Sequence, residues 1–279
     1  MASIKKAYYD TPDGQIHYRY LHSSSEKAQE GIPKDPILLL HMSAASSLYF
    51  EPLMHRLAAL GYDCYAPDMP GFGRSYDPSG QPANTRFYVE TFMLLATQQR
   101  WKHFHVLGHH TGASLGIEMA AMYPAQVRSL CVVGAALLFA PEQKAMADAL
   151  VIAPETYPVR DGAHLLKKWN RLLQYPGFEV DVLHAQVLDQ IRAWQGRRQV
   201  YTCNFAQDIM GFLGLVKCAV LAMSARESML FEYLGRVRNV KPDAKCVTVG
   251  GGEFEVLLDV DGVYQAYKDF LDSVPHVQN

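Results

Sequence analysis

Short apolar runs alternate with amphipathic helical patterns along most of this 279-residue chain. Residues 36–40 (PILLL) have the composition of a buried strand, residues 48–60 the periodicity of a helix, and residues 63–66 the composition of the next strand. Parallel strands need such helix-length connections between them, whereas antiparallel strands can be joined by a tight turn. The alternation therefore predicts an α/β protein with a mostly parallel sheet flanked by helices.

The same succession continues toward the C-terminus and is preceded by a hairpin. The turn TPDG at residues 11–14 separates two β-rich segments, and a polar linker at residues 23–34 leads into the sheet. Further helices are expected at residues 84–99, 111–123 and 228–237, and further strands at residues 103–107, 127–133, 218–223 and 245–249.

The middle of the chain departs from this alternation. Residues 140–214 are mainly helical in pattern, with aromatic and charged residues mixed, before strands return. We therefore expect one domain, with a core formed by residues 1–139 and 215–279 and an inserted helical cap at residues 140–214.

Two motifs lie at turns between predicted strands and helices. Residues 68–75 (DMPGFGRS) follow a strand, and residues 107–113 (LGHHTGA) join a strand to a helix. In a sharp strand-to-helix turn, small residues permit close backbone contacts and raise the central side chain to the mouth of the sheet. In LGHHTGA the glycines are Gly108 and Gly112, and the raised side chain is that of His110.

With these motifs, nearly the whole chain resembles the α/β-hydrolase fold superfamily, whose nucleophile elbow has the pattern G-x-nucleophile-x-G. The sequence GHHTGA, together with residues 161–165 (DGAHL) and Trp169, is similar to a subgroup with histidine at the elbow. The resemblance also implies that Ser43, in the loop after the third strand, supplies an oxyanion-hole amide. Met42 replaces the glycine that usually stands in that loop.

The resemblance also exposes departures from the usual catalytic triad. His110 stands where a serine, cysteine or aspartate nucleophile is normal. Glu227 follows the strand after the cap, at the position of the triad acid, and Glu253 follows the last strand, at the position of the triad histidine. Acyl transfer by a Ser-His-Asp triad therefore cannot be assumed.

An imidazole facing a carboxylate is suited to acid–base chemistry, because a glutamate can fix the histidine tautomer and raise the histidine pKa. We expect His110, with Glu253 or Glu227, to move a proton, while the amides of Thr111 and Ser43 stabilise an enolate or oxyanion. This chemistry suits C–C cleavage, decarboxylation, elimination, isomerisation, cyclisation or hydrolysis. Superfamily members with altered triads include hydroxynitrile lyases and cofactor-free dioxygenases.

Each candidate has a simpler structural interpretation. His110 could mark a non-catalytic elbow, and His109 is expected to pack beneath it. Glu253 could be a solvated loop carboxylate, and Glu227 could stabilise the first turn of a helix at residues 228–237. His41 commonly stabilises its loop through backbone hydrogen bonds.

Three residues near or within the cap are candidates for lining a substrate pocket. His164 and Trp169 lie on predicted cap helices, although packing within the cap would also bury them. Asp208 lies near the end of the cap.

Composition excludes several classes of partner. The formal charge is only −2 and basic residues form no block, which argues against a nucleic-acid or anionic-membrane binder. No apolar run has the length of a membrane span, and the first residues lack the apolar core of a secretory signal. We therefore expect a cytoplasmic protein that acts on a small molecule and that can form a homodimer.

No cofactor or metal is expected. The glycines at residues 250–252 lack the spacing of a phosphate-binding loop, and the segment HMSAASS at residues 41–47 is not a dinucleotide fingerprint. The histidines show no metal-ligand spacing. Five scattered cysteines without a CxxC pair are expected to be free thiols.

Three functional hypotheses follow from the sequence. The first is a cofactor-independent lyase, decarboxylase, isomerase or cyclase that acts on a small carbonyl, lactone or polyketide-like compound. The second is a hydrolase of an ester, lactone or C–C bond that uses water activated by His110 or a covalent intermediate. The third is a non-catalytic small-molecule receptor.

Overall fold

The computed structural model describes residues 3–23, 34–151 and 157–275. Most of the polar linker expected at residues 23–34 lies outside these ranges. The described strands form one sheet in the order β1-β2-β4-β3-β5-β6-β7-β8. They are β1 (Lys5–Thr11), β2 (Gly14–Leu21), β3 (Ile37–Leu40), β4 (Cys64–Pro67), β5 (Phe104–His109), β6 (Val127–Val133), β7 (Ala219–Ala225) and β8 (Lys245–Val249).

The pairing of these strands confirms the predicted α/β-hydrolase architecture. Strand β1 pairs antiparallel with β2, and β2 pairs antiparallel with β4. All other neighbours, from β4 through β3 to β8, pair in parallel. The antiparallel hairpin thus adds one edge to a parallel sheet whose remaining connections are helical.

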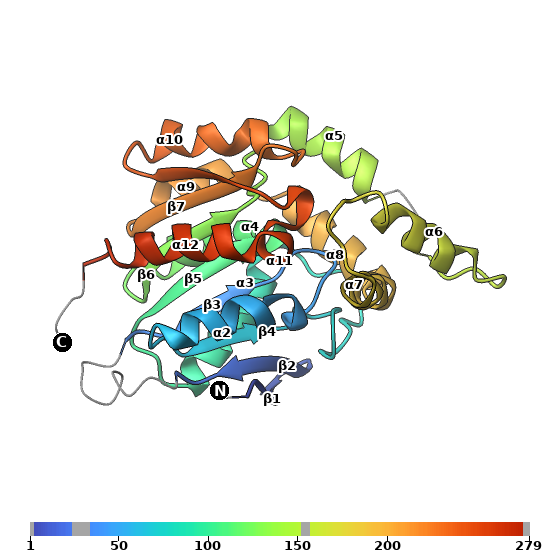
Figure 1. Cartoon of the computed structure of the whole chain (residues 1–279), viewed down its shortest axis with the longest axis horizontal. Helices are drawn as coiled ribbons and strands as arrows, with labels where there is room; N and C mark the ends of the chain where they lie inside the picture. Colours follow the sequence, from blue (N-terminus) through green and yellow to red (C-terminus); the bar gives the residue numbers. More distant parts are fainter. Residues whose placement is uncertain (1–2, 24–33, 152–156, 276–279) are drawn as a thin grey trace.

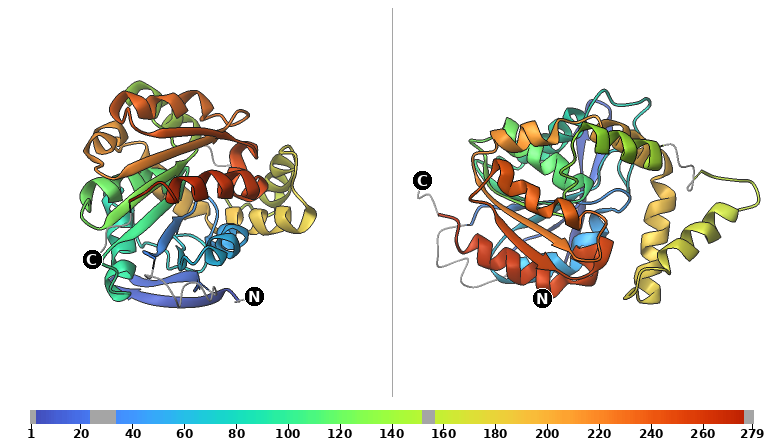
Figure 2. Two further views of the ribbon diagram at one scale, coloured as in Figure 1. Left: turned by 60° about the vertical axis from the view of Figure 1, so that its left-hand side comes forward. Right: turned by 90° about the horizontal axis from the view of Figure 1, so that it is seen from above.

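Helices cover both faces of the sheet (Figures 1 and 2). Helices α2 and α12 pack on one face, while α3, α4, α9 and α10 pack on the other. The main helices are α2 (Glu51–Ala59), α3 (Arg86–Gln98), α4 (Thr111–Met122), α5 (Ala140–Leu150), α6 (Ala163–Leu172), α7 (Val180–Arg192), α8 (Trp194–Asn204), α9 (Ile209–Leu215), α10 (Val237–Val240), α11 (Glu255–Leu258) and α12 (Val260–Leu271).

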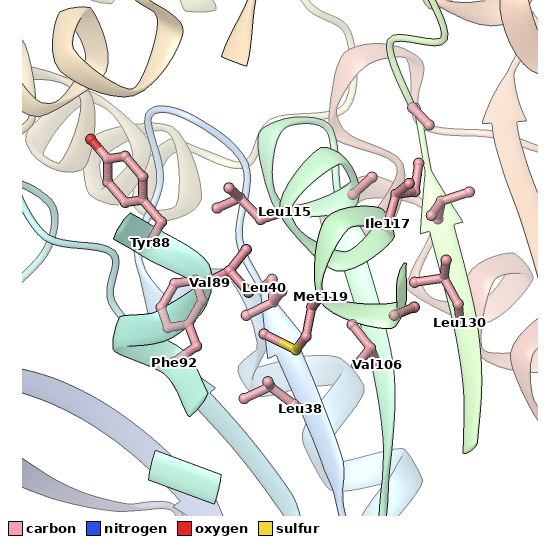
Figure 3. Packing of buried hydrophobic residues seen from close by; sticks show 14 of the residues in the cluster. Leu38, Leu40, Tyr88, Val89, Phe92, Val106, Leu115, Ile117, Met119 and Leu130 are labelled. Atoms are coloured by element: carbon pink, nitrogen blue, oxygen red, sulfur yellow. The ribbon is translucent and has the colours of Figure 1, made fainter. Parts of the chain in front are cut away.

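Buried apolar residues form one core on each face of the sheet, and strand β3 contributes to both. All four of its side chains are buried, as expected for a central parallel strand. Ile37 and Leu39 belong to the core beneath α2 and α12, whereas Leu38 and Leu40 belong to the opposite core. Figure 3 shows Leu38 and Leu40 together with apolar residues of α3 and α4.

In the described part of the segment between β6 and β7, which was expected to form a cap, there are five helices, α5 to α9. Helix α9 contacts α4 of the core, and its Ile209 and Leu213 are buried there. Helices α6 and α7 contact each other and project beyond the sheet (Figures 1 and 2). We refer to residues 140–215 as the helical insertion.

One predicted helix is wrong. Residues 228–237 were expected to be α-helical, but they form a turn followed by the 3-10 helix η2 (Phe231–Arg236). Helix η2 contacts β7 and buries Tyr233, so this short segment packs its apolar residues without forming an α-helix. Among the described residues, no helix is long and apolar enough to cross a membrane.

Candidate active site

His110 occupies a strained turn between β5 and α4. Its φ of 48° and ψ of −110° lie in a region that residues other than glycine rarely adopt. The His110 amide donates a hydrogen bond of 2.9 Å to the carbonyl of Val133 at the end of β6, and the His110 carbonyl accepts the amide of Ala113. The neighbouring strand and the first turn of α4 therefore hold the histidine in this conformation.

The two glycines of the motif allow this turn. A Cβ atom at Gly112 would lie 2.0 Å from the carbonyl oxygen of Leu40, and one at Gly108 would lie 2.2 Å from the carbonyl oxygen of Gly112. Neither position can hold a larger residue without moving the backbone. The spacing G-x-H-x-G is thus required by contact between α4, β5 and the end of β3.

The His110 ring lies between two glutamates. Its Nε2 atom is 3.8 Å from an oxygen of Glu253 and 3.8 Å from an oxygen of Glu255. Both distances exceed hydrogen-bond length, and buried Nε2 has no hydrogen-bond partner among the described residues. Gly134 packs against the ring, where a Cβ atom would approach Nε2 to 2.5 Å.

His109 and Glu255 form a second pair beneath His110. His109 Nε2 lies 2.8 Å from Glu255 Oε2, and both side chains are fully buried. The Tyr49 ring stacks on His109, and the His109 and His110 ring centroids are 4.3 Å apart. The other oxygen of Glu255 accepts a hydrogen bond of 3.3 Å from the Ala225 amide. Packing of His109 beneath the elbow is therefore confirmed, but the residue is also part of the polar cluster.

Burial controls the protonation of this cluster. It lowers the pKa of both His109 and His110 to about 3, and the nearby His109 lowers that of His110 further while Glu255 opposes the shift. Burial also raises the pKa of Glu253 and of Glu255. Glu255 acts on the His110 pKa in the expected direction and raises it, but loss of hydration outweighs this attraction, so the His110 pKa is lowered overall. His110 is neutral at pH 7.

The loops expected to stabilise an oxyanion lie close to the elbow. Thr111 is the first residue of α4, where backbone amides lack intrahelical acceptors and the helix dipole favours negative charge. Ser43 and Met42 are buried, and the Ser43 carbonyl accepts a hydrogen bond of 3.2 Å from the Tyr201 hydroxyl. His41 contacts the Met42 carbonyl at 2.8 Å and accepts the Met69 amide at 2.9 Å, which confirms its role in holding the loop.

A narrow, mainly apolar cavity of about 60 Å³ adjoins the elbow. Helices α5 and α8 of the insertion form one wall, and the elbow and the loops after β6 and β7 form the other. The lining residues are His110, Thr111, Ala136, Leu138, Met146, Leu150, Tyr201, Asn204, Phe205, Met229 and Leu230.

The structure separates four sequence candidates from this cavity. Glu227 is exposed in the turn after β7, and its expected place in the first turn of a helix is wrong because the following helix begins only at Phe231. His164 accepts the Val159 amide at 3.3 Å near the start of α6. Trp169 packs with the core beneath α2 and α12, and Asp208 caps α9 by accepting the Gly211 amide.

Glu255 was missed from sequence because Glu253 matched the family's histidine position. A signal was nevertheless present, since Glu255 lies within the otherwise apolar segment FEVLL at residues 254–258. A carboxylate in such a run is almost never fully buried without a partner. The adjacent pair of histidines offers that partner.

One group of side chains among the described residues could hold a metal ion. Ligand-type atoms of His109, His110 and Glu255 all lie within 4.8 Å of one another. His109 Nε2 and Glu255 Oε2 contact each other at 2.8 Å, whereas buried His109 Nδ1 and His110 Nε2 have no hydrogen-bond partner among the described residues. The contact between His109 and Glu255 is also that of an ordinary histidine–carboxyl pair, so we do not assign these residues as metal ligands.

Comparison with curated proteins identifies short regions of similarity. The chain is 27% identical over 116 residues to a haloalkane dehalogenase from Psychrobacter cryohalolentis, covering 41% of this chain and 36% of that protein. It is 31% identical over 104 residues to a fluoroacetate dehalogenase from a Burkholderia species, covering 35% and 33% respectively. The similarity thus spans only about a third of the length of these relatives, both of which are named as dehalogenases.

Solved structures extend the similarity of fold to nearly the whole chain. An esterase from Exiguobacterium antarcticum superposes with a TM-score of 0.77 at 15% identity, covering 95% of this chain and 99% of that one. The family model for the alpha/beta hydrolase fold matches residues 35–258, which include the elbow, both glutamates and the helical insertion. This chain belongs to the alpha/beta hydrolase fold family.

Proposed function

We propose that this chain is an enzyme that transfers a proton at His110 during a reaction of a small, largely apolar carbonyl compound. The observation that carries the proposal is the position of His110, whose unpartnered Nε2 lies between Glu253 and Glu255 at the elbow. A hydroxyl or thiol nucleophile does not occupy the elbow. The residue raised there is instead a neutral base beside two carboxyl groups.

The proton path has two parts. Neutral His110 accepts a proton from an acidic C–H or O–H group of the substrate, which leaves an enolate or alkoxide. The carboxylate of Glu255 then stabilises the imidazolium, since attraction between the two groups raises the His110 pKa and lowers the Glu255 pKa. The proton returns to the product at the carbon or leaving group, so the enzyme ends each cycle in its starting state.

Charge on the substrate oxygen is expected to be stabilised at the start of α4. Thr111 lines the cavity beside His110 and lies at the positive end of that helix. The loop containing Ser43 is the second candidate donor. We further propose that α5 and α8 act as a cap over the substrate, and that chains with the sequence GHHTG at the elbow form a subgroup of the family with this chemistry.

Hydrolysis is the second candidate function, favoured by the names of the similar proteins, which are two dehalogenases and an esterase. In that reaction His110 accepts a proton from water while the hydroxide attacks a carbonyl carbon. Neither reaction requires a cofactor. The expected cytoplasmic location is supported by the cysteines, all five of which are free.

The test compares wild type with His110→Ala, Glu253→Gln and Glu227→Gln on short esters, lactones and β-keto acids. Products are followed by mass spectrometry in ¹⁸O-labelled water and, separately, in deuterium oxide. Deuterium at carbon without ¹⁸O supports proton transfer, whereas incorporated ¹⁸O beyond carbonyl exchange supports hydrolysis. We expect His110→Ala to lower kcat/KM by at least about 100-fold and exposed Glu227→Gln to leave it unchanged.

Two outcomes would contradict the proposal. Equal turnover by wild type and His110→Ala would remove His110 from the chemistry, and binding of a ligand without turnover by either protein would indicate a receptor. Treatment with a chelator gives a further control, because cofactor-free proton transfer is expected to survive it. Activity that is lost on chelation and restored by a metal ion would contradict the cofactor-free mechanism.

A further inference from the structure

Helices α6 and α7 form an arm that carries several exposed apolar side chains. We define the arm as residues 163–192, which comprise both helices and the turn between them. Its inner side contributes Leu172, Leu183 and Val187 to the core beneath α2 and α12. At the turn, the rings of Tyr175 and Phe178 contact Phe254 at centroid distances of 5.2 and 4.8 Å.

Large apolar side chains are exposed on both helices of the arm and at the turn between them. Eleven large hydrophobic residues are strongly exposed in the described chain, and five of them lie within these 30 residues. They are Leu165, Leu166, Leu173, Val180 and Leu188, with exposed fractions between 45% and 64%. A cluster of this kind on one projecting element marks an interaction surface, whereas single exposed apolar residues are ordinary. The arm projects from the body in Figure 2, and the five side chains are exposed in the described chain.

Charge is divided between the two helices. Helix α6 carries exposed Lys167 and Arg171 and has no acidic residue, while its third cationic residue, Lys168, is buried. The opposite sign occurs at the start of α7, where Glu179 and Asp181 precede and open the helix. An open groove of about 810 Å³ follows α6 and is lined by Leu166, Lys167 and five further residues of this helix and the turn. The basic side of the arm is thus also apolar and concave.

We propose that the arm binds the same arm of a second copy of this chain, with α6 of each copy against α7 of the other. A two-fold axis places each surface patch against its own symmetry mate, so an interface of this type must be self-complementary. The arm meets that requirement because it carries both a basic helix and an acidic helix, each flanked by exposed apolar side chains. An anionic membrane or an acidic protein would be attracted by α6 but repelled by the start of α7.

The interface is independent of the proposed chemistry, because none of the five exposed apolar residues of the arm lines the cavity at His110. Sedimentation equilibrium of the full chain between about 1 and 200 μM is expected to show a monomer–dimer equilibrium in the micromolar range typical of small interfaces. Leu166→Glu should raise Kd at least about tenfold, since it places a charge in an apolar contact. Leu94→Glu is the matched control, because Leu94 is exposed on α3, away from the arm.

A charge exchange tests the pairing of α6 with α7. Lys167→Glu and Asp181→Lys should each weaken self-association at least about threefold, because each places like charges across the axis. An equimolar mixture of the two variants should form a heterodimer tighter than either homodimer, since opposite charges then face each other at both contacts. Thermal unfolding checks that these exposed substitutions leave the fold intact. A monomeric wild type, or a dimer that responds to neither Leu166→Glu nor the charge exchange, overturns the proposal.

Discussion

At the scale of single residues, substitutions of His110 and of Glu255 are expected to have different effects on stability and on activity. His110 has a positive φ that costs an alanine about 1–2 kcal/mol, whereas glycine adopts it freely. At an ordinary helical or strand position alanine would be the more stable of the two. We therefore expect His110→Gly to be more stable than His110→Ala by about 1 kcal/mol in urea unfolding, with both variants inactive. The opposite order would mean that the turn relaxes when the imidazole is removed.

Glu255 is expected to be a structural as well as a chemical residue. Its carboxylate is fully buried and is paired with His109 and the Ala225 amide. Glu255→Ala leaves both donors unpartnered, which should lower the free energy of unfolding by about 3 kcal/mol. Glu255→Gln keeps a hydrogen-bond acceptor and should recover about half of that loss. Exposed Glu227→Ala should change stability by less than about 0.5 kcal/mol. Chemical denaturation of the three variants distinguishes this pattern from a uniform effect.

At the scale of elements, the sequence predicted most of the sheet and its helices because their patterns depend on local properties. Buried parallel strands such as β3 require continuous apolar runs, and the elbow requires glycines at fixed positions. Residues 228–237 were mispredicted as an α-helix because their short apolar pattern does not distinguish that form from a 3-10 helix.

The candidate site was predicted less completely, because it depends on contacts between distant segments. His110 and Glu253 could be named from their places in the family pattern, and they lie 3.8 Å apart. The pairing of His109 with Glu255 spans 146 residues, and no local pattern indicates which of two nearby glutamates turns inward. His164 and Trp169 were placed in the pocket only because they belong to the insertion, whose separate helices take different positions.

The stability of the folded chain is expected to depend on pH through Asp189, at the contact between α7 and the core. Ser46 donates a hydrogen bond of 2.6 Å to Asp189, while burial raises the pKa of Asp189 from 3.8 to about 6 and nearby Asp68 raises it further. Ser46 and Arg19 oppose that rise. The folded chain therefore binds the Asp189 proton more tightly than the unfolded chain does. The stabilisation that comes from this proton is complete below about pH 4 and is lost as the pH rises through about 6.

Asp189→Asn removes this titration and keeps an acceptor for Ser46. The rise in pKa from 3.8 to about 6 corresponds to at most about 3 kcal/mol. Relative to the wild type, the variant should therefore gain stability between pH 4 and pH 7, by up to that amount. Urea unfolding at a series of pH values measures the difference. A constant difference across this range would mean that Asp189 titrates at its ordinary pKa.

At the scale of the whole molecule, the cavity at His110 is too small for most substrates of the proposed classes. Its volume of about 60 Å³ is far below the several hundred cubic ångströms of typical ligand pockets. The wall formed by α5 and α8 must therefore move when substrate binds. Helix α5 is the better candidate, because its described residues include none that is fully buried.

The pair Glu142–Arg236 is expected to control this movement. Arg236, which follows β7, donates two hydrogen bonds of 2.6 and 2.7 Å to Glu142 at the start of α5. A second link is the hydrogen bond of 2.7 Å from Gln143 to the Gln207 carbonyl. Within α5, by contrast, Lys144 pairs with Asp148 and makes no link to the core. Glu142→Gln should therefore speed amide hydrogen exchange in residues 140–150 and lower KM for bulkier substrates. Lys144→Gln should change neither, although it also removes an ion pair from the same helix. Equal effects of the two substitutions would mean that the helix opens by local fraying, and that the link between α5 and Arg236 does not gate the cavity.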